Sequence, residues 1–75
     1  MNYSIHALRH TRFIIGQKIH NLRTQNKMSL KKLSSLSRIP ENRLDEYELG
    51  QNAITFDELF KVACVFEVEV GELVG

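Results

Sequence analysis

Pairs of apolar residues five positions apart recur along this chain, and each pair surrounds a residue that could start a helix. The four pairs are Met28 with Leu33, Ile39 with Leu44, Ile54 with Leu59, and Val68 with Leu73. In a hydrophobic staple, the residue before the helix N-cap packs against the fourth residue of the helix. The pairs therefore predict four helix starts, with helices over about residues 30–36, 40–48, 56–66 and 70–74.

Signals at the helix ends agree with these boundaries. Ser29 is a favourable N-cap residue, and Thr55 followed by Glu58 matches the capping-box pattern. Gly50 is well placed to end the helix over 40–48, because glycine readily adopts the left-handed conformation found just after helices. The run VFEVEV at 65–70 alternates as a strand would. We interpret it as the end of one helix and the start of the next.

A further helix is expected before these four. Ile15, Ile19 and Leu22 recur at spacings of four and three, which places them on one face of a helix over about residues 12–26. Residues 1–11, MNYSIHALRHT, show no clean period. We therefore expect a short N-terminal arm over 1–11, which could include a helical turn, and one helical domain over 12–75.

Length and composition limit the class of protein. A chain of 75 residues makes one domain, and an apolar content of 43% is too high for a disordered tail. The single cysteine, Cys64, excludes an internal disulfide and fits a reducing compartment. No run is long enough to span a membrane, and no signal peptide is visible. These features predict a cytoplasmic protein with no membrane partner.

The charge is unevenly distributed, although the net charge is only +1. Residues 1–38 contain eight lysines and arginines and no acidic residue, whereas residues 39–75 contain two basic and nine acidic residues. Such asymmetry favours a polyanion as the partner of the first half. The alternative is that the two oppositely charged faces attract each other, or a second copy of the chain.

No residue pattern indicates catalysis. His6 and His10 are spaced as metal ligands on a helix would be, but the sequence offers no third ligand nearby. Cys64 has no histidine or acidic motif around it that would make it a nucleophile. No phosphate-binding loop or pair of catalytic carboxylates is present. We expect a protein that is not an enzyme and needs no metal, cofactor or small-molecule ligand.

Residues 15–73 resemble the lambda repressor/Cro class of XRE-type helix-turn-helix domains. The matching segments are IGQKIHNLR as the first helix, MSLKKLSSLSRI as the second helix and turn, ENRLDEYELG as the recognition helix, and ITFDELFKVACVFEVEVGEL as the last two helices. The resemblance implies an all-α, five-helix lambda repressor-like DNA-binding domain with a short N-terminal arm. It also implies a transcriptional regulator of bacterial or phage type, such as a repressor, that binds double-stranded DNA.

The resemblance also implies two groups of DNA contacts. In this class the N-terminal residues of the recognition helix meet base edges, while Leu44 and Tyr47 face inward. The base contacts carried over to this chain are Glu41, Asn42, Arg43 and Glu46. Asparagine suits adenine, arginine suits guanine, and glutamate accepts from cytosine. The phosphate contacts carried over are Ser29, Lys31, Lys32, Arg38, Gln51 and Asn52.

Three positions depart from the family pattern. Leu30 stands where glutamine is common. Arg38 stands in the turn where glycine usually adopts a left-handed conformation, which costs about 1 kcal/mol for a residue with a Cβ. Pro40 stands at the start of the recognition helix, where a hydroxyl residue is common, and proline supplies no capping oxygen.

The C-terminal part is unusually apolar, which predicts a subunit interface. The residues expected there are Cys64, Val65, Val68, Val70 and Val74. An exposed apolar patch often marks an interface, so we expect a homodimer on a palindromic operator; a larger core is the alternative. A second function also remains open. The acidic recognition helix would suit an antitoxin-like or adaptor module that binds a protein and has weak or no DNA binding.

Overall fold

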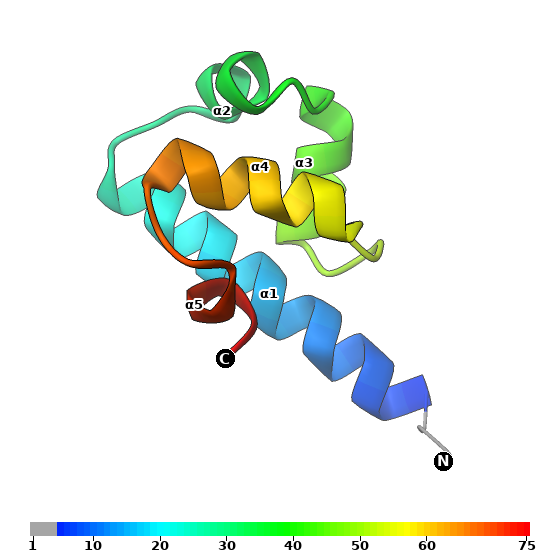
Figure 1. The fold of residues 1–75 in the computed structure, drawn as a ribbon. Coiled ribbons are helices and arrows are strands. Elements are labelled where there is room, and N and C mark those ends of the chain that lie inside the picture. The colour runs from blue at the N-terminus through cyan, green and yellow to red at the C-terminus, as the bar shows by residue number, and fades with distance from the viewer. Residues whose placement is uncertain (1–4) are drawn as a thin grey trace.

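The computed structural model describes the backbone of residues 5–75 and the side chains of residues 7–75, and these form a bundle of one long and four shorter helices (Figure 1). The helices are α1 (Ile5–Gln25), α2 (Leu30–Ser37), α3 (Glu41–Glu48), α4 (Phe56–Phe66) and α5 (Val70–Val74). Residues 5–75 include no strand. The predicted all-α, five-helix fold is confirmed, and the boundaries of the last four helices agree with those expected from the staples.

The start of α1 differs from the prediction. The helix begins at Ile5 rather than near residue 12, so residues 5–11 are helical and do not form an arm. Residues 7–11 are exposed, and the N-terminal end of α1 extends away from the other helices (Figure 1). A helical turn that buries no face shows no apolar period. The residues of the expected arm that precede Ile5 lie outside the described part of the chain.

The leucines of the four staples form the centre of the core. Leu33, Leu44 and Leu73 are completely buried, and Leu59 is nearly so. Of their staple partners, Ile39 is buried, and the other three are half-buried and packed against the same core. Burying a leucine side chain contributes about 1.5–3 kcal/mol. The same residues that start the helices therefore also hold them together.

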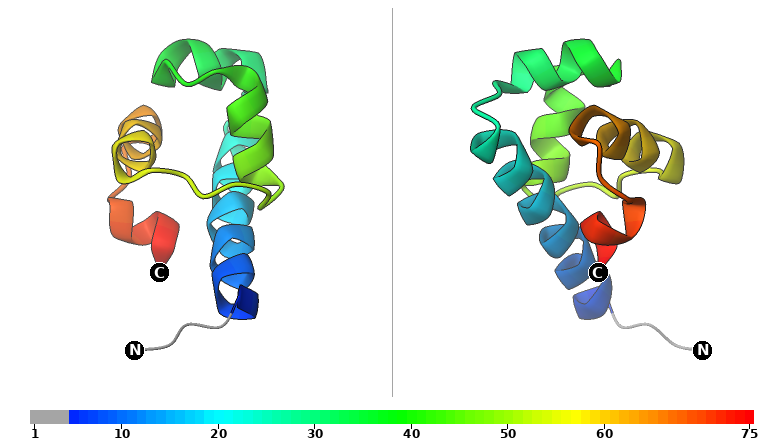
Figure 2. Two further views of the ribbon diagram at one scale, coloured as in Figure 1. Left: turned by 90° about the vertical axis from the view of Figure 1, so that its right-hand side faces the viewer. Right: turned by 60° about the vertical axis from the view of Figure 1, so that its left-hand side comes forward.

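Helix α1 packs against both α3 and α5, so it connects helices from different parts of the chain. Helix α3 packs against α1 and α2, while α5 packs against α1 and α4, and Figure 2 shows α1 running along the molecule beside α3. The close approach of α1 to α3 requires Gly16. A Cβ atom there would overlap the backbone carbonyl oxygen of Tyr47, so α3 could not lie at this distance from α1 with a larger residue.

The helix ends follow the predicted capping signals. Ser29 accepts a hydrogen bond from the Lys32 N–H, and Thr55 with Glu58 forms the expected capping box. Pro40 starts α3 without a side-chain hydrogen bond. Arg38 has the predicted left-handed conformation, with φ of 61°.

The segment that alternates as a strand would is helical at both ends. Helix α4 continues to Phe66, Glu67 adopts a left-handed conformation with φ of 56°, and α5 begins at Val70. A second capping box, between Glu69 and Glu72, starts α5. The interpretation of residues 65–70 as two helix ends is confirmed.

Candidate nucleic-acid interface

Helix α3 has a buried side and an exposed side. Leu44, Tyr47 and Glu48 are buried, whereas Glu41 and Asn42 in its first turn are exposed. The inward orientation expected for Leu44 and Tyr47 is therefore confirmed. The first turn of the helix is free to meet another molecule while its other side is fixed to the protein.

A shallow hollow lies at the junction of α2 and α3. It is lined by Leu30, Glu41, Asn42 and Asp45. Leu30 is half-buried and packs against the core, so leucine at this position adds apolar contact where glutamine would add a polar group. Asp45 is exposed, although it was not among the expected base contacts.

On the buried side, an ion pair fastens α3 to α1. The Arg23 Nε donates to Glu48 Oε2 at 2.6 Å, and Nη2 donates to Glu48 Oε1 at 3.0 Å. His20 Nδ1 lies 2.8 Å from Glu48 Oε1, and Arg23 Nη1 also donates to the Met28 carbonyl at 2.8 Å. The hydrogen bond to Glu48 raises the pKa of Arg23 above its usual value, against the opposing effect of burial. No local sequence pattern predicts this pair, because its partners are 25 residues apart.

A second ion pair fastens α3 to α4. Arg43 Nη2 lies 3.0 Å from Glu58 Oε2, and it donates to the Tyr47 hydroxyl oxygen at 2.8 Å. The Tyr47 hydroxyl in turn donates to Glu58 Oε1 at 2.6 Å, and the Thr55 hydroxyl donates to the same oxygen at 2.9 Å. Arg43, an expected base contact, is thus engaged within its own chain, although its side chain is 48% exposed.

Burial and hydrogen bonding around this second pair shift the pKa values of Glu58 and Tyr47. Burial alone would raise the pKa of Glu58, but the hydrogen bonds from Tyr47 and Thr55 and the nearby Arg43 charge lower it below its ordinary value of 4.5. Burial, together with the hydrogen bond to Glu58, raises the pKa of Tyr47 above 10.0. Glu58 is therefore a carboxylate and Tyr47 a neutral phenol at neutral pH.

The other acidic residue expected at the bases is less exposed. Glu46 is half-buried, and its Oε1 accepts a hydrogen bond from Asn52 Nδ2 at 3.0 Å. Asn52 was expected to contact phosphate; it is exposed, and in the structure its side chain lies against the Glu46 carboxylate. Gln51, the other loop residue expected at phosphate, is exposed. Glu41 is exposed and forms no ion pair within the described residues.

The start of α2 presents basic groups. Lys31 and Lys32 are exposed in its first turn, which contains no acidic residue, and Ser29 caps the helix. A helix N-terminus carries a partial positive charge that favours anions. Arg38 is exposed at the opposite end of α2, roughly 12 Å along the helix. The structure therefore groups Ser29 with the two lysines and separates them from Arg38.

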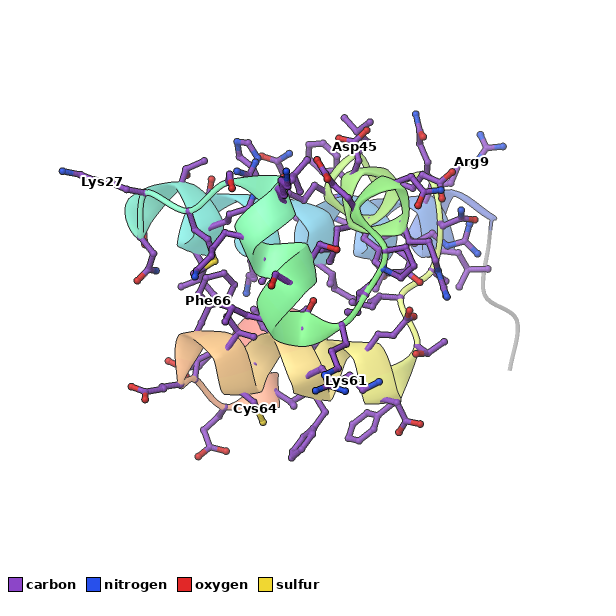
Figure 3. All side chains as sticks on the ribbon, turned by 90° about the horizontal axis from the view of Figure 1, so that it is seen from above. Arg9, Lys27, Asp45, Lys61, Cys64 and Phe66 are labelled. Atoms are coloured by element: carbon purple, nitrogen blue, oxygen red, sulfur yellow. The ribbon has the colours of Figure 1, made fainter. Side chains whose placement is uncertain are left out.

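The apolar residues of the C-terminal part are distributed differently from what was expected. Val65, Val68 and Val70 are half-buried and packed against the core, whereas Cys64 and Val74 are exposed. Larger apolar side chains are also exposed, among them Leu36 and Phe60, which line one hollow together with Cys64 and Val65. Viewed from above, Cys64 and Lys61 of α4 lie on the opposite side of the molecule from Asp45 of α3 (Figure 3).

Two histidines near the N-terminus have the spacing of metal ligands on a helix. His10 is exposed, and the side chain of His6 lies outside the described residues. Among the residues that the structure describes, no three or more histidine, cysteine, aspartate or glutamate side chains gather where they could hold a metal ion. In the same part of the chain, no helix has the length and apolar character needed to cross a membrane.

Solved structures share this fold. The chain is similar to the restriction-modification controller protein C.AhdI from Aeromonas hydrophila, with a TM-score of 0.80 and 27% identity over 83% of this chain and 94% of that one. It is also similar to two structures of the clp gene regulator ClgR from Corynebacterium glutamicum. Both are 22% identical over 84% of this chain, with TM-scores of 0.80 and 0.78 over 67% and 82% of those chains. No curated protein sequence gives a significant match.

A comparison with protein-family models places the chain in a family. The helix-turn-helix model matches residues 19–73, which include the whole of α2 and α3 and the hollow between them. This match covers well over half of the chain. The protein therefore belongs to the XRE-type helix-turn-helix family of DNA-binding regulators, the lambda repressor/Cro-like class.

Proposed function

We propose that this protein is a sequence-specific transcriptional regulator that inserts α3 into the major groove of DNA. The observation that carries the proposal is the presentation of α3: its buried side is fixed to α1 and α4 by ion pairs, and its first turn stands exposed beside the basic start of α2. In helix-turn-helix proteins the first turn of the second helix meets base edges. C.AhdI, which shares the fold, is a restriction-modification controller protein.

Two sets of residues would have different roles in such a complex. Exposed Asn42 is suited to adenine, and exposed Glu41 can accept a hydrogen bond from cytosine. Ser29, Lys31 and Lys32 at the start of α2 would hold phosphate, because backbone amides and lysines there share one anion-binding end. The remaining proposed contacts are Glu46 at the bases and Arg38, Gln51 and Asn52 at phosphate. Arg43, which the sequence analysis placed at the bases, would meet DNA while paired with Glu58 at 3.0 Å.

Selection of bound duplexes from a random pool tests the function. A folded protein that enriches a defined sequence would support it. Asn42→Ala should then weaken binding to the selected site by about 1–3 kcal/mol and change binding to random duplex little. Asn21→Ala, an exposed asparagine on α1, is the matched control and should change neither. Equal loss on both duplexes would mean that α3 does not recognise bases.

We further propose that the regulator acts as a homodimer on a palindromic operator. The proposed contact lies in the C-terminal part, around Cys64, Val65, Val68, Val70 and Val74. Recognition helices of such dimers sit about 34 Å apart, one turn of DNA. Sedimentation at micromolar concentration, with and without the selected duplex, measures the state of association. A monomer under both conditions would contradict this part of the proposal.

A second candidate function is an antitoxin-like or adaptor module that binds a protein through α3. The observation in its favour is the acidic exposed side of the helix, where Glu41 and Asp45 form no ion pair among the described residues. Leu49, at the end of the helix, is 57% exposed. Absence of binding to any duplex at low salt would favour this module over the DNA-binding regulator.

A further inference from the structure

We infer that Glu58, on α4, determines how Arg43 can meet DNA: it limits the Arg43 guanidinium to single hydrogen bonds and prevents the paired contact that recognises guanine. The inference rests on the proposed DNA-binding function. It assigns a positioning role to a residue outside the recognition helix, and it changes the expected role of Arg43 from a base contact to a phosphate contact.

The contacts of the Arg43 guanidinium show which of its donors are already engaged within the protein. Arg43 Nη2 has two protons, and three acceptors surround it: the Tyr47 hydroxyl at 2.8 Å, Glu58 Oε2 at 3.0 Å and Glu58 Oε1 at 3.2 Å. A guanidinium presents two edges that can donate a pair of parallel hydrogen bonds, and Nη2 belongs to both of them. With both Nη2 protons engaged, neither edge is available for guanine O6 and N7, which need two parallel donors.

The remaining donors can still reach DNA one at a time. Arg43 Nε and Nη1 make no hydrogen bond within residues 5–75, and the side chain is 48% exposed. A single charged donor suits a phosphate oxygen, whose recognition does not depend on base sequence. In the held position, Arg43 therefore contributes affinity rather than guanine preference.

The Glu58 carboxylate is fixed in place, so Arg43 cannot move toward DNA without losing its contacts with Glu58. Its side chain is 11% exposed, and Oε1 also accepts hydrogen bonds from the Tyr47 hydroxyl and from the Thr55 hydroxyl and N–H. The capping box that starts α4 thus fixes the carboxylate in place. A guanine that is to receive two bonds from Arg43 must first separate the guanidinium from Glu58, and charge-assisted hydrogen bonds are among the stronger ones.

Glu58→Gln tests the inference. Glutamine keeps an oxygen for the capping box, which accepts Glu or Gln at this position, but it removes the charge that holds Arg43. In selection from a random pool, E58Q should gain a preference for guanine over other bases at one position, of about 5- to 100-fold. The wild type should lack that preference, and the double variant Arg43→Ala/Glu58→Gln should lose it again.

The matched control is Glu72→Gln. Glu72 is the corresponding residue of the α5 capping box, where it accepts from the Glu69 N–H at 2.8 Å. The substitution makes the same change of charge and tests the same kind of cap without involving Arg43. It should leave the selected sequence unchanged. A guanine preference in both variants would mean that net charge, not Arg43, is responsible, and would overturn the inference.

Tyr47→Phe provides a second, independent variant. It removes the shortest of the three Nη2 contacts, at 2.8 Å, and leaves the two longer ones to Glu58. Because the guanidinium is then held less strongly, guanine preference should rise by a smaller amount in the same direction, even if E58Q does not fold. Unchanged base preference in folded E58Q, or a wild-type guanine preference that Arg43→Ala abolishes, would overturn the inference while the DNA-binding function stands. Failure of every folded variant and the wild type to bind any duplex at low salt would overturn both.

Discussion

Two arginine–glutamate pairs hold α3 from opposite sides, and they differ in burial. In the pair between Arg23 and Glu48 the side chains are 14% and 5% exposed, whereas in the pair between Arg43 and Glu58 the arginine is 48% exposed. The shortest distances are similar, 2.6 Å and 3.0 Å. A buried pair cannot lose one partner without leaving an uncompensated charge, whereas a pair with one half-exposed side chain is partly screened by water and contributes less to stability.

Because the two pairs differ in burial, they have different roles. The buried pair fixes the position of α3 relative to α1, because the carboxylate of Glu48 has Arg23 and His20 as its partners. The second pair also links α3 to α4, and it holds the Arg43 guanidinium through Nη2 while Nε and Nη1 remain able to donate to a phosphate. The same chemistry therefore supports folding on one side of α3 and orientation toward a ligand on the other.

Removing one partner of the buried pair should have the largest effect. Arg23→Ala should lower the free energy of unfolding by about 3–5 kcal/mol, because Glu48 would remain buried without its charge partner. Urea denaturation followed by circular dichroism measures this loss. Arg43→Ala is the matched control and should change stability much less. Equal losses in the two variants would remove the distinction between the pairs.

Truncating the apolar contact between the two pairs should have the next largest effect. Leu44 is completely buried on α3, so Leu44→Ala should cost about 2–5 kcal/mol through lost contacts and the cavity left behind. Leu49→Ala, at an exposed position near the end of the same helix, is the control. If Leu44→Ala melts at the wild-type temperature, then the core does not hold α3 in the described orientation.

The basic residues proposed to contact DNA differ in whether an acidic side chain of the same chain is paired with them. Lys31 and Lys32 have no ion-pair partner among the described residues. Lys31→Ala or Lys32→Ala should weaken binding to all duplexes alike and reduce the slope of log affinity against log salt by about one unit. Arg43→Ala should reduce that slope less, because Glu58 already neutralises the guanidinium. An unchanged slope in both lysine variants would remove α2 from the interface.

Low pH should weaken the pair between Arg43 and Glu58. The resulting loss of stability should be the smallest of the effects predicted for the two pairs. The pKa of Glu58 is lower in the folded protein than its ordinary value of 4.5. Its contribution is therefore complete above pH 4.5 and is lost as the pH falls through the folded value. The difference in denaturation midpoint between wild type and Glu58→Gln should be constant near neutral pH and shrink below about pH 4.5. A difference that persists to pH 2 would mean that the charge of Glu58 does not stabilise the fold.

The local signals in the sequence were sufficient for most helix boundaries. The staple pairs and the capping residues act over three to five positions, so they can be recognised before the fold is known. The left-handed conformation at Arg38 was predicted in the same way and is confirmed by its φ of 61°. The start of α1 was missed, because its exposed first turns bury no face and leave no apolar period.

The number of helices, the ends of the last four and the leucines of the core could all be predicted from the sequence, since they depend on interactions between near neighbours. The pairing of charged side chains could not be predicted, because it depends on how the helices pack. Arg23 and Glu48 are 25 residues apart, and Arg43 and Glu58 are 15 apart. Their pairing depends on how three helices cross, including the close approach that Gly16 permits. Arg43 therefore looks like a free base-reading residue in the sequence, and only the position of α4 places a fixed carboxylate beside it.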